Sequence, residues 1–141
     1  MALLSILTAM AAVCNGVSSV GVAYAAPPQA APKDGNLPAV VPEPSMRAEI
    51  AWGNAHDGRQ HEIVLDVLVS RGDDLSQKIA AVVPVLEDVL AAFRTNQTLG
   101  GLTYECRPTG YEITPISYAG ETYVGAAITF TVKEKSAVTF S

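Results

Sequence analysis

Apolar residues near the start of the chain recur at helical spacing. They stand three or four residues apart, as along one side of an α-helix, and are Leu3, Ile6, Leu7, Met10 and Val13. Asn15 and Gly16, which readily adopt the left-handed conformation that closes a helix, follow the stripe. The pattern predicts an amphipathic helix of about three turns, and the weak alternation of residues 17–24 predicts a strand after it.

A second apolar stripe predicts the main core helix, within "RGDDLSQKIAAVVPVLEDVLAAFRTN". Its members are Leu75, Ile79, Val82, Leu86, Val89, Leu90 and Phe93. Asp73 and Asp74 can cap the start of this helix, and Arg94 suits the negative end of its dipole. Pro84 lies inside the stripe and lacks the amide for one backbone hydrogen bond, so we expect either a kink or a restart of the helix there.

Alternating apolar and polar residues predict strands before this helix. Leu37–Pro44 fits a short edge strand, because Pro42 and Pro44 cannot donate the amide hydrogen bonds of a central strand. Ser45–Trp52 and Gln60–Ser70 flank the turn formers of "GNAHDG" and therefore predict a hairpin. In its second arm, His61, Ile63, Leu65, Val67 and Val69 share one face, and Glu62, Asp66 and Ser70 point mostly the other way.

Three further strands are expected after the core helix, at Leu102–Arg107, Gly110–Tyr118 and Thr122–Lys133. The last one alternates between two sets of side chains. The apolar set is Val124, Ala126, Ile128, Phe130 and Val132, and the smaller or more polar set is Gly125, Ala127, Thr129, Thr131 and Lys133. One face of this strand should therefore line the core, while the other meets water or a partner.

Together these elements predict one α+β domain over residues 1–141. We expect a mixed, mainly antiparallel β-sheet on which an N-terminal helix and a central core helix pack. A Pro/Ala-rich segment, residues 25–37, should form a long exposed loop, and residues 134–141 a short polar C-terminal tail. Loops of this length in small domains are commonly functional.

Composition narrows the classes of function. Fourteen acidic and nine basic residues give a formal net charge of -5, and no cluster of Lys or Arg interleaved with aromatic residues occurs, so direct nucleic-acid binding is disfavoured. Cys14 and Cys106 have no partner at metal-ligand spacing, which predicts two buried, unreactive thiols. A disulfide between them would matter only in an oxidising compartment.

The first 25 residues invite comparison with a secretory signal. "AYAA" is a suitable small-residue cleavage site, but no Lys or Arg occurs before Lys33, so the positively charged region of a signal is missing. The apolar run also breaks at Cys14–Gly16, which is too early for a membrane span of about 20 residues. We therefore expect the segment to stay on the chain and pack; its removal would favour a secreted small binding module instead.

Residues with chemical potential do not form a catalytic constellation. His56 and His61, with Asp57 and Glu62 nearby, could bind a metal, but their spacing fits neither one helix face nor one strand face. Glu87 and Asp88 are adjacent on a helix and point apart, which does not suit a paired acid and base. Nucleophile-elbow, phosphate-loop and dinucleotide motifs are missing from the sequence. The sequence predicts a protein that is not an enzyme and needs no cofactor or metal.

The order of elements resembles a known family. The N-terminal "LTAMAAVCNGVSSV", the "LPAVVPEP" strand, the helix "LEDVLAAFRTNQTLGG" and the hairpin "ISYAGETYVGAAITFTV" are similar to the tail terminator, or tail-completion, proteins of long-tailed bacteriophages. "TLGG" and "YAGETYVGA" are the most distinctive pieces, and the likeness covers nearly the whole chain. The long "AAPPQAAPKDGN" loop and the polar tail "KEKSAVTF" depart from the family pattern.

The resemblance implies a structural virion protein, assembled in the host cytoplasm. Family members fold as a mixed sheet with helices and form a hexameric ring on the finished tail tube, where the ring ends tube polymerisation and supports head–tail joining. The implied partners are further copies of the chain, the tube protein and a head-side connector or neck protein. DNA would pass through the lumen without specific binding, and no membrane is involved. A tube subunit or another neck component remains an alternative.

Candidate contact residues for these partners come from two loops and from the second face of the last strand. The set is Pro27, Pro28, Lys33, Asp34, Asn54, His56, Asp57, Gly125, Ala127 and Thr129. Loops are where binding residues concentrate, and the small side chains of the strand offer a flat surface to another chain.

Overall fold

The structure is a computed structural model, and it describes residues 2–28, 30, 32, 37–52, 57–72, 74–99 and 103–134. These residues form two helices and five strands: α1 (Ala2–Asn15), β1 (Val22–Ala23), β2 (Ala39–Trp52), β3 (Asp57–Arg71), α2 (Leu75–Arg94), β4 (Thr103–Tyr118) and β5 (Glu121–Glu134). The strands make one sheet in the order β1-β2-β3-β5-β4. β1 runs parallel to β2, and the other neighbours are antiparallel. The predicted α+β fold is confirmed.

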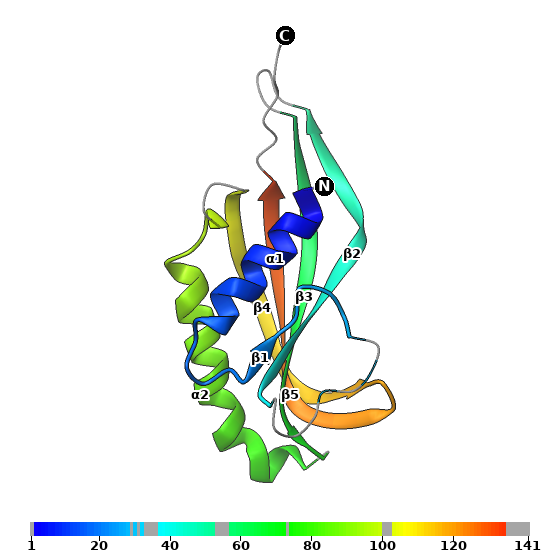
Figure 1. Ribbon diagram of the computed structural model, residues 1–141, viewed down its shortest axis with the longest axis vertical. Coiled ribbons are helices and arrows are strands. Elements are labelled where there is room, and N and C mark those ends of the chain that lie inside the picture. Colours follow the sequence, from blue (N-terminus) through cyan, green and yellow to red (C-terminus); the bar gives the residue numbers. More distant parts are fainter. Residues whose placement is uncertain are drawn as a thin grey trace.

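Both helices lie on the same face of the sheet (Figure 1). Alternate side chains of β3 and β5 point into the layer between sheet and helices, which is the main core. The rings of Phe93 on α2 and Phe130 on β5 lie with their centroids 4.6 Å apart. Other buried members of this core include Ile6, Met10, Ile63, Leu65, Val67, Val82, Leu86, Val89, Ala126, Ile128 and Val132.

α1 confirms the predicted N-terminal helix and its packing. Its buried or half-buried stripe includes Ile6, Leu7, Met10 and Val13; the side chain of Leu3 lies outside the described residues. The side-chain oxygen of Asn15, at the end of the helix, accepts a hydrogen bond from the backbone amide of Ala23 at 2.9 Å. Its side-chain amide donates to the Ala23 carbonyl at 3.3 Å. Asn15 therefore ties the helix end to β1.

The strand expected at residues 17–24 is wrong in length, because β1 contains only Val22 and Ala23. The amides before it bond locally instead. Val17 N donates to the Cys14 carbonyl at 3.0 Å, and Val20 N donates to the Val17 carbonyl at 3.1 Å. These turns use backbone amide groups that a longer strand would have needed for hydrogen bonds to its neighbouring strand.

α2 continues through Pro84, so the expected restart of the helix is wrong. Figure 1 shows the axis of α2 bending in its N-terminal half, as an internal proline favours. Ile79, which was predicted to face the core, is 46 % exposed, because this half of α2 extends past the end of α1 (Figure 1). Asp73 lies outside the described residues, and Asp74 accepts a hydrogen bond from the Ser76 hydroxyl at 2.8 Å.

Two pairs of predicted strands are single strands in the structure. β2 runs on through Pro44, with a register shift between Pro44 and Ala48. β4 runs on through Pro108, with a shift between Pro108 and Gly110. Both are outer strands at these points, since β1 pairs with β2 only at Ala39 and Val40. A proline there removes a donor on a strand with one long partner, so the strand bends without ending.

The two cysteines confirm the prediction of buried thiols. Cys14 and Cys106 are both free and fully buried in the main core. Burial raises the pKa of each thiol to about 12, with the neighbouring Cys106 adding to the effect at Cys14. Both therefore stay protonated near neutral pH, and a protonated thiol is a poor nucleophile.

Candidate interaction surface

The second face of the sheet, opposite the helices, carries the predicted contact residues of β5. Because Ala126, Ile128 and Phe130 point into the main core, the alternate residues Ala127 and Thr129 point to the other face. Both are half-buried there. The predicted two-faced character of this strand is confirmed.

Gly125 has a structural reason to be glycine. It is buried between β3 and β4, and a Cβ atom built on it would lie 1.9 Å from the carbonyl oxygen of Val67. The close approach occurs beside a register shift between Leu68 and Ser70, where β3 has one more residue than β5. A contact role on this face is therefore better examined at Ala127 and Thr129, whose substitution does not force the strands apart.

Part of the loop at residues 25–37 lies on the second face, so the expectation of a wholly exposed loop is wrong. Pro27 is exposed, but Pro28 is half-buried and Pro32 is buried. The Tyr118 hydroxyl donates a hydrogen bond to the Pro28 carbonyl, and the Tyr123 hydroxyl donates to the Pro32 carbonyl at 3.2 Å. Beneath it lies a second small apolar cluster, which includes Ala39, Val41, Leu68 and Tyr123.

Most of the remaining predicted contact residues lie outside the part of the chain that the structure describes. Lys33, Asp34, Asn54 and His56 lie outside the described residues. Asp57 opens β3 opposite Trp52, with only its backbone described. Figure 1 shows the end of β2 and the start of β3 at the opposite end of the sheet from the turn that joins β4 to β5.

A buried carboxyl group on the second face was missed as a site residue. Asp66 on β3 is only 4 % exposed, although it was predicted to point away from the core. Its side chain is hydrogen-bonded to that of Glu43, and burial first, then the Glu43 charge, raises the pKa of Asp66 to about 7. Burial and the nearby Glu43, Tyr24 and Asp66 also raise the pKa of Tyr118. The signal for this buried carboxyl group in the sequence was an acidic residue between two apolar residues, in a strand that has a neighbouring strand on each side.

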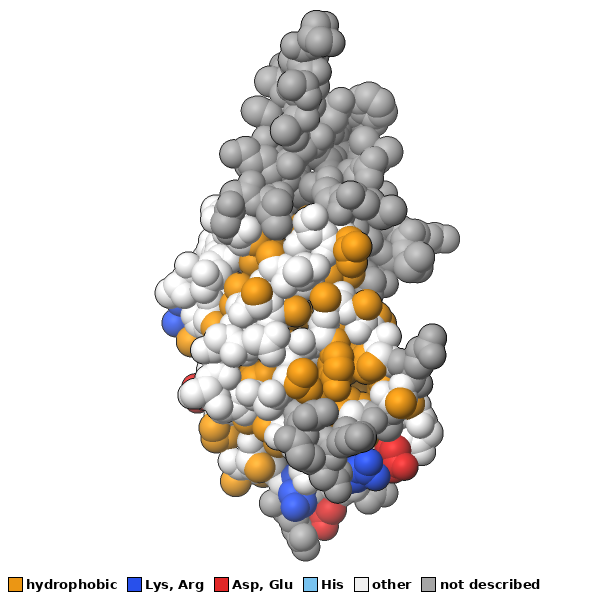
Figure 2. Space-filling view, in the orientation of Figure 1, with side chains coloured by type: hydrophobic (Ala, Val, Ile, Leu, Met, Phe, Trp, Pro, Cys, Tyr) orange, Lys and Arg blue, Asp and Glu red, His pale blue; other side chains and the backbone are white. Residues whose placement is uncertain are grey.

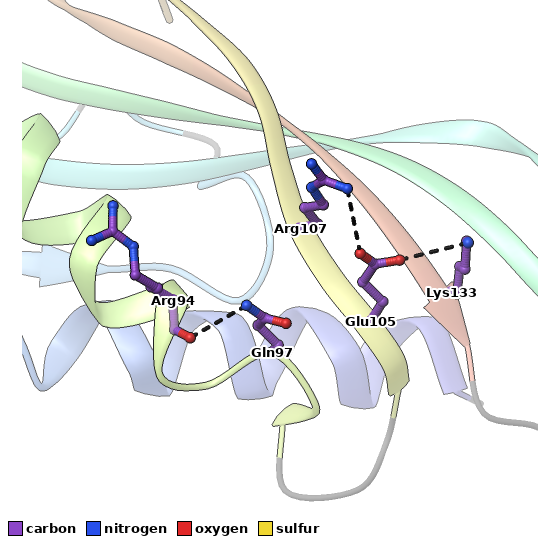
Figure 3. Close-up of polar contacts among 5 residues, drawn as sticks. All are labelled: Arg94, Gln97, Glu105, Arg107 and Lys133. Atoms are coloured by element: carbon purple, nitrogen blue, oxygen red, sulfur yellow. Dashed lines mark hydrogen bonds and ion pairs between the residues drawn. The ribbon is translucent and has the colours of Figure 1, made fainter.

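Positive charge gathers where the end of α2 meets β4. An open hollow of about 390 Å³ lies there, lined by Leu90, Arg94, Gln97, Arg107, Pro108, Thr109, Gly110 and Tyr111. Figure 3 shows the two arginines coming from different elements, Arg94 from α2 and Arg107 from β4. Glu105 lies between two cations, 3.9 Å from Arg107 and 3.6 Å from Lys133. Tyr111, at the hollow, is 58 % exposed.

The helical face looks different from these charged regions. Figure 2 shows mainly hydrophobic and uncharged side chains over it, with most of the charged groups gathered at the lower end of the view. α1, "ALLSILTAMAAVCN", contributes no charged side chain. Among the described residues, charge is therefore concentrated away from α1.

The described residues contain no cluster of His, Cys, Asp and Glu arranged to hold a metal ion. In the same part of the chain, neither helix has the length and apolar character needed to cross a bilayer. The fold and this surface define an α+β domain with one helix-covered sheet face and charged groups near both outer strands. Neither a family model nor a curated protein matches the chain.

Proposed function

We propose that this protein is a structural component of a phage tail, which caps the tail tube as a hexameric ring. In this role it ends tube polymerisation and supports the joining of tail to head, after assembly in the host cytoplasm. The observation that carries the proposal is the sequence of elements that resembles the tail terminators. The mixed sheet with an N-terminal and a central helix agrees with the fold expected of that family.

The arrangement of the sheet supports a ring of identical chains. A ring forms when a patch on one copy binds a different patch on the next and the rotation closes. The two outer strands provide different patches, because β4 borders the hollow of Arg94 and Arg107, and β2 carries Glu43 beside Asp66. A formal charge of -5 on each chain would also make the ring repel DNA phosphates, as a conduit requires.

Deletion of the gene is the direct test. Without a terminator, tubes should reach uncontrolled lengths or fail to join full heads, while heads still package DNA. Electron microscopy of the lysate measures tail length and head attachment. Tails of normal length joined to full heads would overturn the proposal, and short or missing tubes would favour the alternative of a tube subunit.

A pair of point variants separates a contact defect from misfolding. Ala127→Arg places a long charged side chain on the second face of β5, and Thr122→Arg places the same side chain at an exposed position of the same strand. Ala127→Arg should reproduce the deletion phenotype if this face meets another chain, and Thr122→Arg should not. Circular dichroism of both purified variants checks that each is folded.

A further inference from the structure

Among the described residues, a cluster with net positive charge lies at one outer border of the sheet, and a pair of carboxyl groups lies at the other; the exposed Glu112 stands further along β4, outside the positive cluster. The first, called the basic border, consists of Arg94, Arg107 and Lys133 with Glu105 among them. The second, called the acidic border, consists of Glu43 and Asp66. β4 is the outer strand at the basic border, and β2 is the outer strand at the acidic border, since its pairing with β1 stops at Val40.

The basic border has positive charge to spare. The Arg107 side chain is 69 % exposed, and its ion pair with Glu105 is long at 3.9 Å. Glu105 is shared with Lys133 at 3.6 Å, so one carboxylate serves two cations. The hollow beside them is lined by two guanidinium groups, and no carboxylate occurs among its described lining residues. An arginine fork at such a place suits a carboxylate from another molecule.

The acidic border has the opposite imbalance. Glu43 is exposed on β2, and its side chain is hydrogen-bonded to the buried side chain of Asp66 on β3. Tyr118 lies near both Glu43 and Tyr24, and these two groups contribute to its raised pKa. Two carboxyl groups held together at one border repel each other when both ionise, and an incoming cation would relieve that repulsion.

We propose that the basic border of one copy docks against the acidic border of the next copy, with Arg107 facing Glu43. The contact rests on the proposed function, because it supplies the head-to-tail interface that a ring needs. Two different patches, one at each outer strand, can repeat around a closed ring. Opposite charges at the two borders fix the register and disfavour pairing of two identical borders.

Charge reversal tests the contact. Arg107→Glu would place two carboxylates against each other at every interface, and Glu43→Arg would place two guanidinium groups there. Each single variant should assemble roughly tenfold or more weakly than the unmodified chain, as measured by native mass spectrometry and sedimentation. The double variant, with both changes in every chain, should regain assembly because attraction is restored with reversed sign.

Matched controls carry the same charge changes elsewhere. Lys78→Glu and Glu87→Arg alter exposed positions of α2 outside both borders, and each should assemble like the unmodified chain. Rescue by the double variant cannot come from net charge alone, because Lys78→Glu combined with Glu43→Arg has the same net charge and should not be rescued. The proposed contact is wrong if Lys78→Glu combined with Glu43→Arg also regains assembly. It is equally wrong if Arg107→Glu combined with Glu43→Arg does not regain assembly.

Cross-linking gives an independent readout. A chain with Tyr24→Cys and Thr109→Cys carries one thiol beside each border and keeps Glu43 and Arg107; under mild oxidation it should form a ladder of covalent oligomers that extends beyond dimers. Each single cysteine variant can at most link two copies. The native cysteines are buried, so they do not compete. The experiment is done on purified protein and on virus particles.

The outcomes separate the two proposals. A ladder in either sample supports the docking contact. Particles that contain the chain but yield no ladder overturn the contact and leave the proposed function standing. A chain that is missing from particles and stays monomeric in solution overturns both. If assembly appears only after an acidic protein is added and the ladder stays at dimers or below, the basic border serves a different partner and the docking contact is wrong.

Discussion

Asp66 is buried in a strand that has neighbours on both sides, with Val41 of β2 and Ala127 of β5 as its register partners. Burial and the adjacent Glu43 raise the pKa of Asp66 from 3.8 to about 7 in the folded chain. The folded state therefore holds this proton more tightly than the unfolded state does. A raised pKa contributes stability that is fully present at low pH and is lost as pH rises through the folded value.

We expect the unfolding free energy to fall as pH rises from about 4 to about 8, by on the order of 2 kcal/mol from this group. Asp66→Asn keeps the shape and removes the titration, so it should flatten the pH dependence and raise stability at pH 8. Urea unfolding across this pH range measures the effect. Glu62→Gln, an exposed carboxylate on the same strand, is the control. An unchanged pH slope in Asp66→Asn would contradict the prediction.

Gly125 provides a second test at the residue scale. A Cβ atom there would meet backbone, not a flexible side chain, 1.9 Å from the Val67 oxygen. Gly125→Ala should therefore destabilise the fold by more than about 2 kcal/mol, because two central strands must move apart. Gly110→Ala is the matched control, since a Cβ atom there has nothing within 4 Å. Similar denaturation midpoints for both variants would show that β3 and β5 adjust without cost.

Helix α1 is part of the main core, and its removal would uncover apolar surface. Met10 is 1 % exposed and Leu4 is 57 % exposed on the same helix. Met10→Ala should cost about 2–5 kcal/mol of unfolding free energy, whereas Leu4→Ala should cost well under about 1 kcal/mol. Chemical denaturation measures both. If Met10→Ala lowers the unfolding free energy no more than Leu4→Ala does, α1 contributes little to stability. The secreted alternative, in which this segment is removed, then gains support.

The same helix could be predicted from sequence because its packing repeats with the helical period. The same holds for Val82, Leu86 and Val89 of α2 and for β5, in which every second side chain reaches the core. The ends of the strands were harder to predict from the sequence. The sequence predicted strand breaks near Pro44 and Pro108, yet both strands continue because outer strands tolerate a missing donor.

The candidate surface could be predicted only in part. Alternation placed Ala127 and Thr129 on the correct face, but the Glu43–Asp66 pair depends on the pairing of β2 with β3, which no local pattern contains. The hollow beside Arg94 and Arg107 likewise joins residues from α2 and β4. Contacts between distant segments follow from topology, and local periodicity does not encode them.

At the scale of the whole molecule, the sheet has a protected centre and two outer strands. β3 and β5 have long partners on both sides, whereas β4 has one neighbour and β2 has one over residues 41–52. Outer strands offer backbone groups to other chains, and the interrupted pairing at Pro44 and Pro108 limits uncontrolled association. Assembly should therefore change the exposure of backbone amides at the borders of the sheet and leave that of the central amides unchanged.

Hydrogen exchange can read this difference directly. In the isolated chain, amides of β3 and β5 should exchange slowly, while outward amides of β4 and of residues 41–52 should exchange faster. In the assembled particle the second group should slow by tenfold or more, because neighbouring copies bury it, and the first group should stay the same. Peptide-level mass spectrometry on both samples compares them within one chain, so β3 serves as the internal standard. Equal exchange of the outer strands in both states would mean that neither border meets another copy, and would remove the structural basis for a ring.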